Sequence, residues 1–134
     1  MNAWTGVFGN SYNTRQTLPV DARKAMFARI LASTRHRIGS VIEFGAGTGE
    51  NLKALRSLLV GAQLTGVELN ADAHRQLKNV ADLAFHGSIL EFPSAGQWDI
   101  SMTRGLLIHI QPVELLRAYE ILYKAAARYV LLAE

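Results

Sequence analysis

Short apolar segments alternate along the chain with segments in which apolar residues recur at helical spacing. The apolar segments span residues 41–44, 64–70, 83–90, 98–105 and 129–134, and the third includes the residues that follow its strand. Brief apolar stretches bounded by turn residues are typical of strands buried on both faces of a parallel sheet. The alternation therefore predicts an α/β fold in which right-handed crossovers join parallel strands.

The segments between these strands are predicted to be helices. One starts at Pro19 and ends near residue 33, one follows residue 49, one covers 71–78, and the last opens at Pro112. Proline suits the first turn of a helix, and an apolar stripe predicts a packing face. The expected stripes are Val20, Met26, Phe27, Ile30 and Leu31; then Leu52, Leu55, Leu58 and Leu59; and finally Leu115, Leu116, Tyr119, Leu122 and Tyr123.

Composition narrows the class of protein. The chain has 134 residues, of which 49% are apolar and 19% are charged, as in a single globular domain. No apolar stretch is long enough for a membrane span and no secretion signal is visible, so we expect a cytoplasmic protein without a membrane partner. There is no cysteine, and the four histidines lack metal-ligand spacing, so no metal site is predicted. A net charge of +3, spread along the chain, gives little reason to expect a nucleic-acid partner.

A glycine-rich loop follows the first predicted strand. Gly45, Gly47 and Gly49 stand at alternate positions and lead into a helix, which predicts a turn built around a bound small molecule. The spacing does not fit a dinucleotide fingerprint, whose last glycine would fall on Glu50, and no P-loop lysine follows. Carboxylates at Glu43 and Glu50 would also repel a pyrophosphate. The ligand is therefore expected to be neutral or cationic at this end.

The pattern Glu43-x-Gly45-x-Gly47-x-Gly49 resembles the first motif of class I methyltransferases that depend on S-adenosylmethionine (SAM). The resemblance implies one SAM-binding, Rossmann-like domain over residues 1–134, with strand order 3-2-1-4-5 and SAM as cofactor. It also implies that the last antiparallel hairpin of such domains is lacking. The cofactor contacts implied for this motif come from Glu43, Gly45, Ala46, Gly47, Thr48, Gly49 and Asn51.

An acidic residue stands where such a domain would hold a ribose. Glu68 lies 19 positions beyond Gly49 at the end of the second predicted strand, where a βαβ unit places a carboxylate against both ribose hydroxyls. Leu69 is expected beside it in the cofactor site. Asn70 is predicted to cap the helix that begins at Ala71.

Two further segments are expected to face the glycine loop. The resemblance places Ser88 and Ile89, after the third strand, around the adenine ring. Thr103, Arg104 and Gly105 end the fourth strand, and ligands of open α/β sheets lie beyond the carboxyl ends of strands. His109 follows on the same side and is the best candidate acid or base, although a buried histidine with one satisfied nitrogen explains it equally well. His86 is expected to be a partly exposed strand residue.

Two stretches resemble a narrower group, the methylases associated with biosynthesis of pseudaminic acid, a nonulosonic sugar. They are Trp4-x-Gly6-x-Phe8-Gly9-x-x-Tyr12-x-x-Arg15 and the segment Thr103-Arg104-Gly105-x-Leu107-Ile108-His109-Ile110. The resemblance implies that residues 1–18 cover the cofactor, with Tyr12 and Arg15 near its methionine end, and that the acceptor is a small molecule such as a nonulosonic acid or its precursor. Tyr12 joins His109 as a candidate catalytic residue. A frayed N-terminus whose aromatic residues cover the core is the alternative.

Three other functions remain as alternatives. A nucleic-acid amino-methyltransferase should carry adjacent prolines after its fourth strand, but Pro19, Pro93 and Pro112 are isolated. The glycine spacing opposes an NAD-dependent enzyme. The strongest alternative is a SAM-binding module without catalysis, because class I domains normally continue beyond a fifth strand into an antiparallel hairpin. The apolar strand at 129–134 would then be an uncovered edge, so we expect self-association through it.

Overall fold

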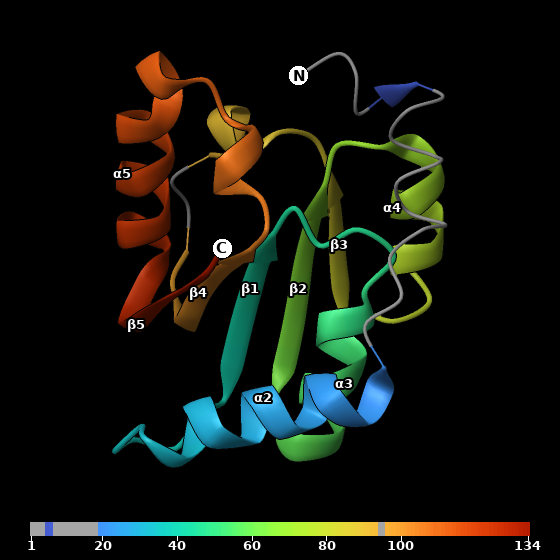
Figure 1. Ribbon diagram of the computed structural model, residues 1–134, viewed down its shortest axis with the longest axis vertical. Helices are drawn as coiled ribbons and strands as arrows, with labels where there is room; N and C mark the ends of the chain where they lie inside the picture. Colours follow the sequence, from blue (N-terminus) through green and yellow to red (C-terminus); the bar gives the residue numbers. More distant parts are fainter. Residues whose placement is uncertain (1–4, 7–18, 94–95) are drawn as a thin grey trace.

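The computed structural model describes residues 5–6, 19–93 and 96–134. A five-stranded sheet forms the centre of the molecule, and its order is β3-β2-β1-β4-β5 (Figure 1). All four strand pairs are parallel. The strands are β1 (Ser40–Phe44), β2 (Gln63–Glu68), β3 (Leu83–His86), β4 (Trp98–Arg104) and β5 (Ala126–Ala133). The Rossmann-like α/β fold and the strand order expected from the sequence are confirmed.

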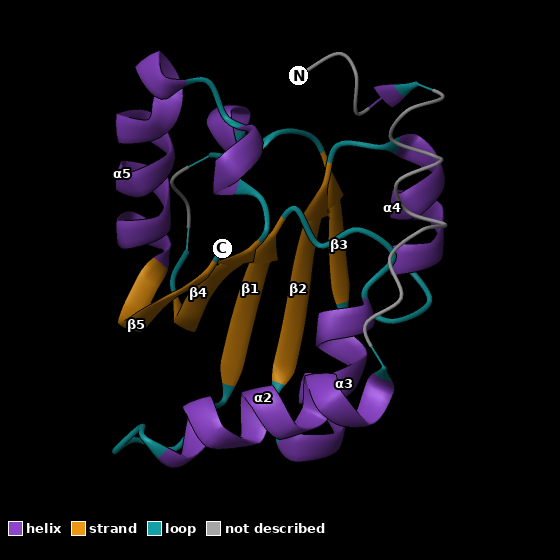
Figure 2. Cartoon of the chain, in the orientation of Figure 1, coloured by secondary structure: helices purple, strands orange, loops and turns teal. Residues whose placement is uncertain are grey.

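Helices cover both faces of this sheet. Figure 2 shows them in purple around the orange strands. The α-helices are α2 (Val20–Ala32), α3 (Glu50–Leu58), α4 (Ala71–Leu77) and α5 (Leu115–Ala125), and the 3₁₀ turns are η2 (Ile89–Glu91), η3 (Leu107–His109) and η4 (Pro112–Glu114). Asn70 caps α4 as predicted, because its side-chain oxygen accepts a hydrogen bond from the Ala73 N–H at 3.0 Å. None of the helices described is long and apolar enough to cross a membrane.

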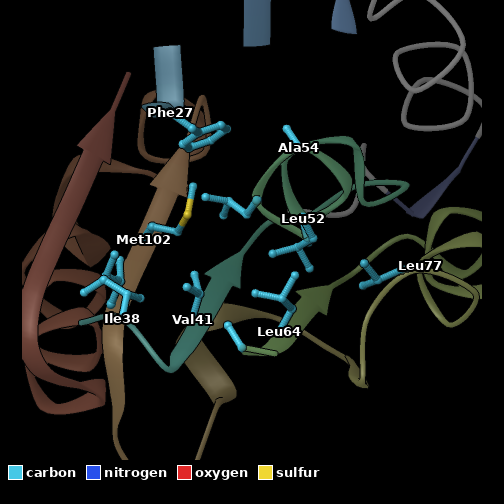
Figure 3. Close-up of a cluster of buried hydrophobic side chains, with 12 residues drawn as sticks. Phe27, Ile38, Val41, Leu52, Ala54, Leu64, Leu77 and Met102 are labelled. Atoms are coloured by element: carbon cyan, nitrogen blue, oxygen red, sulfur yellow. The ribbon is translucent and has the colours of Figure 1, made fainter. Parts of the chain in front are cut away.

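The core has two parts, one on each side of the sheet. On one side, α2, α3 and α4 pack against the strands through residues that include Phe27, Val41, Leu52 and Met102 (Figure 3). On the other side, α5 packs against Ile42, Phe44 and Trp98. Successive residues of β1 thus enter opposite cores, as the two-residue period of a strand requires. Apolar burial on both faces fixes β1 in the middle of the sheet.

Helix α5 buries only part of the stripe predicted from its sequence, namely Leu122 and, in part, Leu115. Its buried residues are Ala118, Ile121, Leu122 and Ala125, whereas Leu116, Tyr119 and Tyr123 are 71%, 45% and 77% exposed. The helix carries two apolar stripes, and the one that contains two alanines lies on the sheet. We attribute this choice to closer approach of the helix axis to the strands over small side chains.

Strand β3 ends at His86, and Ser88 and Ile89 follow it as predicted, with the residues after Ser88 in the turn η2. Other boundaries differ from the predicted ones. Pro112 opens the short turn η4, so α5 itself begins at Leu115. Strand β5 begins at Ala126, three residues before the predicted start at Tyr129, because the alanines there continue the pairing with β4.

Candidate functional site

The glycine loop joins β1 to α3 at the carboxyl edge of the sheet. Gly45, Gly47 and Gly49 have φ values of +71°, +58° and +93°, in the left-handed region that favours glycine. The N–H groups of Gly45 and Ala46 donate to the carbonyl of Val67 at 2.8 and 3.0 Å. These bonds fix the loop against the end of β2.

A neighbouring loop approaches Gly45 so closely that a side chain there would require Leu106 to shift. A Cβ atom there would lie 2.9 Å from Cδ1 of Leu106, a residue of the segment after β4. A glycine at this position therefore permits close contact between the two loops as well as the turn itself. This contact brings the segment that contains His109 against the predicted cofactor loop.

Glu68 lies against the glycine loop. Its side chain is buried at the end of β2, where Oε2 accepts from the Gly47 N–H at 2.7 Å and Oε1 accepts from the Asn70 N–H at 2.8 Å. A carboxylate offers about four acceptor positions, so this group retains acceptor capacity for hydroxyl donors. The carboxylate expected to bind a ribose is thus held beside the loop by two backbone N–H groups.

Glu43 belongs to a buried polar chain. It is completely buried, and its Oε2 accepts from Nδ2 of Asn51 at 2.5 Å. The Oδ1 of Asn51 in turn accepts from the guanidinium of Arg23, which is 4% exposed on α2. These hydrogen bonds therefore connect α2, α3 and the end of β1.

Burial is the main influence on the pKa values of Glu43 and Arg23. It raises the pKa of Glu43 to about 8, although the hydrogen bond from Asn51 and the charge of Arg23 act in the opposite direction. Burial, with the nearby charge of Arg104, lowers the pKa of the Arg23 guanidinium. An uncharged carboxyl at Glu43 is consequently favoured at neutral pH.

Sequence reasoning missed Arg23. The residue stands three positions before Met26 and four before Phe27, so helical spacing places it on the packing face of α2. A charged residue within an apolar stripe is a signal for a buried pairing, because unpaired buried charge is costly. That signal is visible in the sequence.

The end of β4 is held by the last residue of the sequence. The buried Thr103 hydroxyl donates to Oε1 of Glu134 at 2.7 Å, and the N–H groups of Leu107 and Ile108 donate to Oε2 at 3.0 and 3.4 Å. Gly105, at φ +66°, donates its N–H to the carbonyl of Ala133 at 3.0 Å. The Thr103 side chain, expected to face a cofactor, is directed to Glu134.

The residues predicted around an adenine follow β3. Ile89 is 3% exposed, and the Ser88 hydroxyl accepts from the Leu90 N–H at 3.1 Å as the cap of η2. His86 is exposed, as expected, and its ring stacks on that of His74 at a centroid distance of 5.0 Å. Its Nε2 lies 3.0 Å from the carbonyl oxygen of Leu69.

The remaining candidates are placed only in part. His109 lies partly buried in η3, where its N–H donates to the carbonyl of Leu106 at 3.0 Å. Arg104 is partly buried at the end of β4, and Thr48 is partly buried in the glycine loop. Tyr12 and Arg15, with the proposed covering segment 1–18, lie outside the described residues apart from positions 5 and 6. The described part of the chain has no cluster of three metal-ligating side chains.

The structure therefore brings most of the predicted residues to one edge of the sheet. Hydrogen bonds join Glu43 to Asn51 and Glu68 to the glycine loop, and Arg104 acts electrostatically on Glu43. Ser88 and His109 extend this edge on its two sides, after β3 and β4 respectively. The arrangement offers two buried carboxyl groups, Glu43 and Glu68, to hydroxyl and cationic donors of a ligand.

Comparison with known proteins identifies structural neighbours. No model of a known protein family matches the sequence, and no curated protein sequence matches it. Magnesium protoporphyrin IX methyltransferase from Synechocystis PCC 6803, solved with bound SAM, has a TM-score of 0.76 at 13% identity; the match covers 98% of this chain and 72% of that one. The sugar N-methyltransferase KedS8 from Streptoalloteichus sp ATCC 53650 has a TM-score of 0.71 at 19% identity, over 91% of this chain and 50% of that one.

A third neighbour is the glycopeptide N-methyltransferase MtfA, solved with SAM, at a TM-score of 0.68 and 15% identity. This chain spans 53% of its length, so about half of each N-methyltransferase has a counterpart here. At these identities the likeness concerns the fold. The chain has the Rossmann-like fold of SAM-dependent methyltransferases.

Proposed function

We propose that the chain binds SAM across the carboxyl ends of β1, β2 and β4 and transfers its methyl group to a small-molecule acceptor. The observation that carries the proposal is the pairing of Glu68 with the glycine loop, through the 2.7 Å bond from the Gly47 N–H. A nucleoside whose ribose bonds to Glu68 would have its 5′ substituent beside glycines that lack side chains. The neighbours solved with SAM support the same cofactor.

The electrostatics of the site favour SAM over a nucleotide phosphate. Two carboxyl groups, Glu43 and Glu68, are buried at the loop, and SAM carries an ammonium and a sulfonium cation there instead of a pyrophosphate. When bound, SAM supplies a methyl group activated by the sulfonium. The residues of the chain contribute orientation and exclusion of water, which suffice for much of an in-line displacement.

In this proposal His109 is the residue that activates the acceptor, as a general base. It follows β4 in η3, next to Leu106, which contacts the glycine loop. Tyr12 is the second candidate, on the resemblance of the N-terminal segment. A base is needed only if the acceptor loses a proton, and general-base effects amount to about 10²- to 10⁴-fold.

The acceptor we propose is a small sugar, with a nonulosonic acid such as pseudaminic acid or its precursor as the first candidate. Its support is the resemblance of the segments around Tyr12 and after Thr103. A sugar N-methyltransferase among the structural neighbours agrees with a carbohydrate acceptor in general terms. A SAM-binding module without catalysis is the second candidate, because the bond between Glu68 and the glycine loop would serve binding alone.

Calorimetric titration with SAM and S-adenosylhomocysteine, with NAD as a comparison ligand, tests the cofactor. Glu68→Ala should weaken binding by about 1.5 to 3 kcal/mol, the range for charge-assisted hydrogen bonds. Glu120→Ala is the matched control, because it removes an exposed carboxylate of α5. Equal affinities of the wild type and Glu68→Ala would refute the assignment of Glu68.

Methylation of a panel of sugars then separates the enzyme from the binding module. With an active acceptor, His109→Asn should lower turnover while SAM affinity stays near that of the wild type. SAM binding without methylation of any sugar in the panel, nonulosonic acids included, would favour the binding module.

A further inference from the structure

One oxygen of Glu43 takes no part in the hydrogen bonds that join Arg23, Asn51 and Glu43. Its Oε2 is bonded to Asn51, but its Oε1 has no hydrogen-bond partner among the described residues, and the side chain is completely buried. Buried polar atoms are usually hydrogen-bonded, and an unsatisfied one is costly. Glu43 stands two residues before Gly45, and its side chain is bonded to Asn51 in the first turn of α3, directly after the glycine loop.

Charged groups reach Glu43 from three neighbouring elements. Arg23 acts from α2 and Arg104 from the end of β4, and both favour the ionised carboxylate. Glu68 acts from β2 and disfavours it, while Glu50 of α3 acts on Arg23. Burial outweighs these charges, so the free protein is expected to hold Glu43 as a neutral carboxylic acid at neutral pH.

A cationic ligand group would change this balance. SAM and S-adenosylhomocysteine both carry an α-amino group, and an ammonium beside Oε1 would donate the hydrogen bond that this oxygen lacks. It would also add a positive charge in a desolvated site, where the ionised carboxylate is then favoured. The ligand ammonium and the Glu43 carboxylate would then form an ion pair in which the carboxyl proton has no place.

We propose that cofactor binding is coupled to release of the Glu43 proton. The O–H bond of the carboxyl breaks, the proton passes to the solvent buffer, and the ligand's ammonium donates to the carboxylate that remains. The inference rests on the proposed function, since it takes the α-amino group of SAM as the incoming cation. It adds a regulation of the same site by pH, in which affinity rises with pH until Glu43 is ionised in the free protein.

Calorimetry with S-adenosylhomocysteine at about pH 6.5 measures the coupling. A free α-amino group has a pKa of about 7.7 to 8.0, so the ligand is already a cation at this pH and contributes almost no proton change. Repeating the titration in buffers of different ionisation enthalpy gives the number of protons released. We expect about one for the wild type and for Glu120→Gln, and about zero for Glu43→Gln.

The pH dependence of affinity gives the same test by another route. The association constant of the wild type should rise by up to tenfold per pH unit between about pH 5.5 and 7.5, where one proton is released on binding. Glu43→Gln should lack this dependence. Asn51 can still donate to the glutamine carbonyl, so the variant retains the buried chain.

Infrared difference spectra of the wild type provide a measurement that needs no variant. The carbonyl band of a protonated, buried carboxyl group should disappear when S-adenosylhomocysteine is added. Binding with no loss of this band and no released proton would overturn the coupling and leave the proposed function standing. No binding between about pH 6 and 9 would overturn both.

Discussion

The carboxylate of Glu134 accepts a hydrogen bond from the hydroxyl of Thr103 at 2.7 Å, across the ends of β4 and β5. The same carboxylate accepts from two backbone N–H groups of the segment that leads to His109. That segment contacts the glycine loop through Leu106. The end of β5 is thereby connected, by a bond and then by a packing contact, to the loop on which we propose that SAM lies.

Glu134→Ala should loosen this end of the molecule. It leaves the Thr103 hydroxyl and two N–H groups without their acceptor, and hydrogen bonds to a charged group contribute about 1.5 to 3 kcal/mol. We expect a loss of stability near the lower figure, because Glu134 is itself exposed. Urea denaturation measures it, and Glu134→Gln should recover part of the loss. Faster amide exchange should appear at Leu107 and Ile108 in the alanine variant, and unchanged exchange there would contradict the role of Glu134.

The protonation of Glu43 should make stability fall as pH rises. Its pKa is raised from 4.5 to about 8 in the folded chain, so between these values the folded state holds a proton that the unfolded state has lost. The stabilisation is complete below about pH 4.5 and is lost as pH rises through about 8. The slope for one proton is about 1.4 kcal/mol per pH unit at most.

Urea denaturation of the ligand-free protein between about pH 5 and 8 measures this slope. Glu43→Gln should flatten the curve, whereas Glu120→Gln, at an exposed position of α5, should leave it as in the wild type. A wild-type curve that is already flat in this range would show that Glu43 is ionised throughout.

Gly45→Ala should be more destabilising than Gly61→Ala. Both glycines have positive φ, +71° and +81°, so both substitutions strain the backbone by about 1 kcal/mol or more. A Cβ at Gly45 would meet Leu106 at 2.9 Å, but a Cβ at Gly61 would meet no atom within 4 Å. The difference between the two variants in free energy of unfolding reports the contact between the loops. Equal losses would mean that Leu106 moves aside freely.

The two faces of α5 should respond differently to truncation. Leu122 is 1% exposed, and Leu122→Ala should cost about 2 to 5 kcal/mol, the range for large-to-small changes in a core. Tyr123 is 77% exposed, and Tyr123→Ala should change stability by about 0.5 kcal/mol or less. Thermal unfolding of the two variants tests which face of α5 lies against the sheet. Comparable losses would restore the stripe predicted from the sequence.

More of the fold than of the candidate site could be predicted from the sequence. Segment alternation predicted the elements, and Asn70 marked a cap that the structure confirms. Helix α5 was misread because Leu116 and Tyr123 form an apolar stripe as regular as the buried one, and only the sheet decides between them. Hydrogen bonds between distant residues had no local signal: Arg23 meets Asn51 across 28 positions, and Thr103 meets Glu134 across 31. Such pairs follow from the packing of elements, which spacing alone does not specify.

The last prediction concerns the outer edge of β5. The order of the sheet leaves β5 as an edge strand, with Val130 and Leu132 41% and 50% exposed. The carbonyl of Ala133 accepts from Gly105, on the β4 side. Because successive residues of a strand direct their backbone groups to alternate sides, those of Val130 and Leu132 are directed outward. This edge offers a template for a further strand.

We propose that the polypeptide of residues 1–134 self-associates through this edge. An antiparallel pair with Leu131 on the two-fold axis places Val130 opposite the second copy's Leu132, so apolar residues face apolar ones. Light scattering at increasing concentration should show a dimer. Val130→Lys with Leu132→Lys should abolish it, because charged side chains blunt an edge strand. Tyr123→Lys should not, because it removes apolar surface from α5 away from the backbone edge. A wild-type monomer at high micromolar concentration, with the β5 amides protected from hydrogen exchange, would show that the edge is covered in another way.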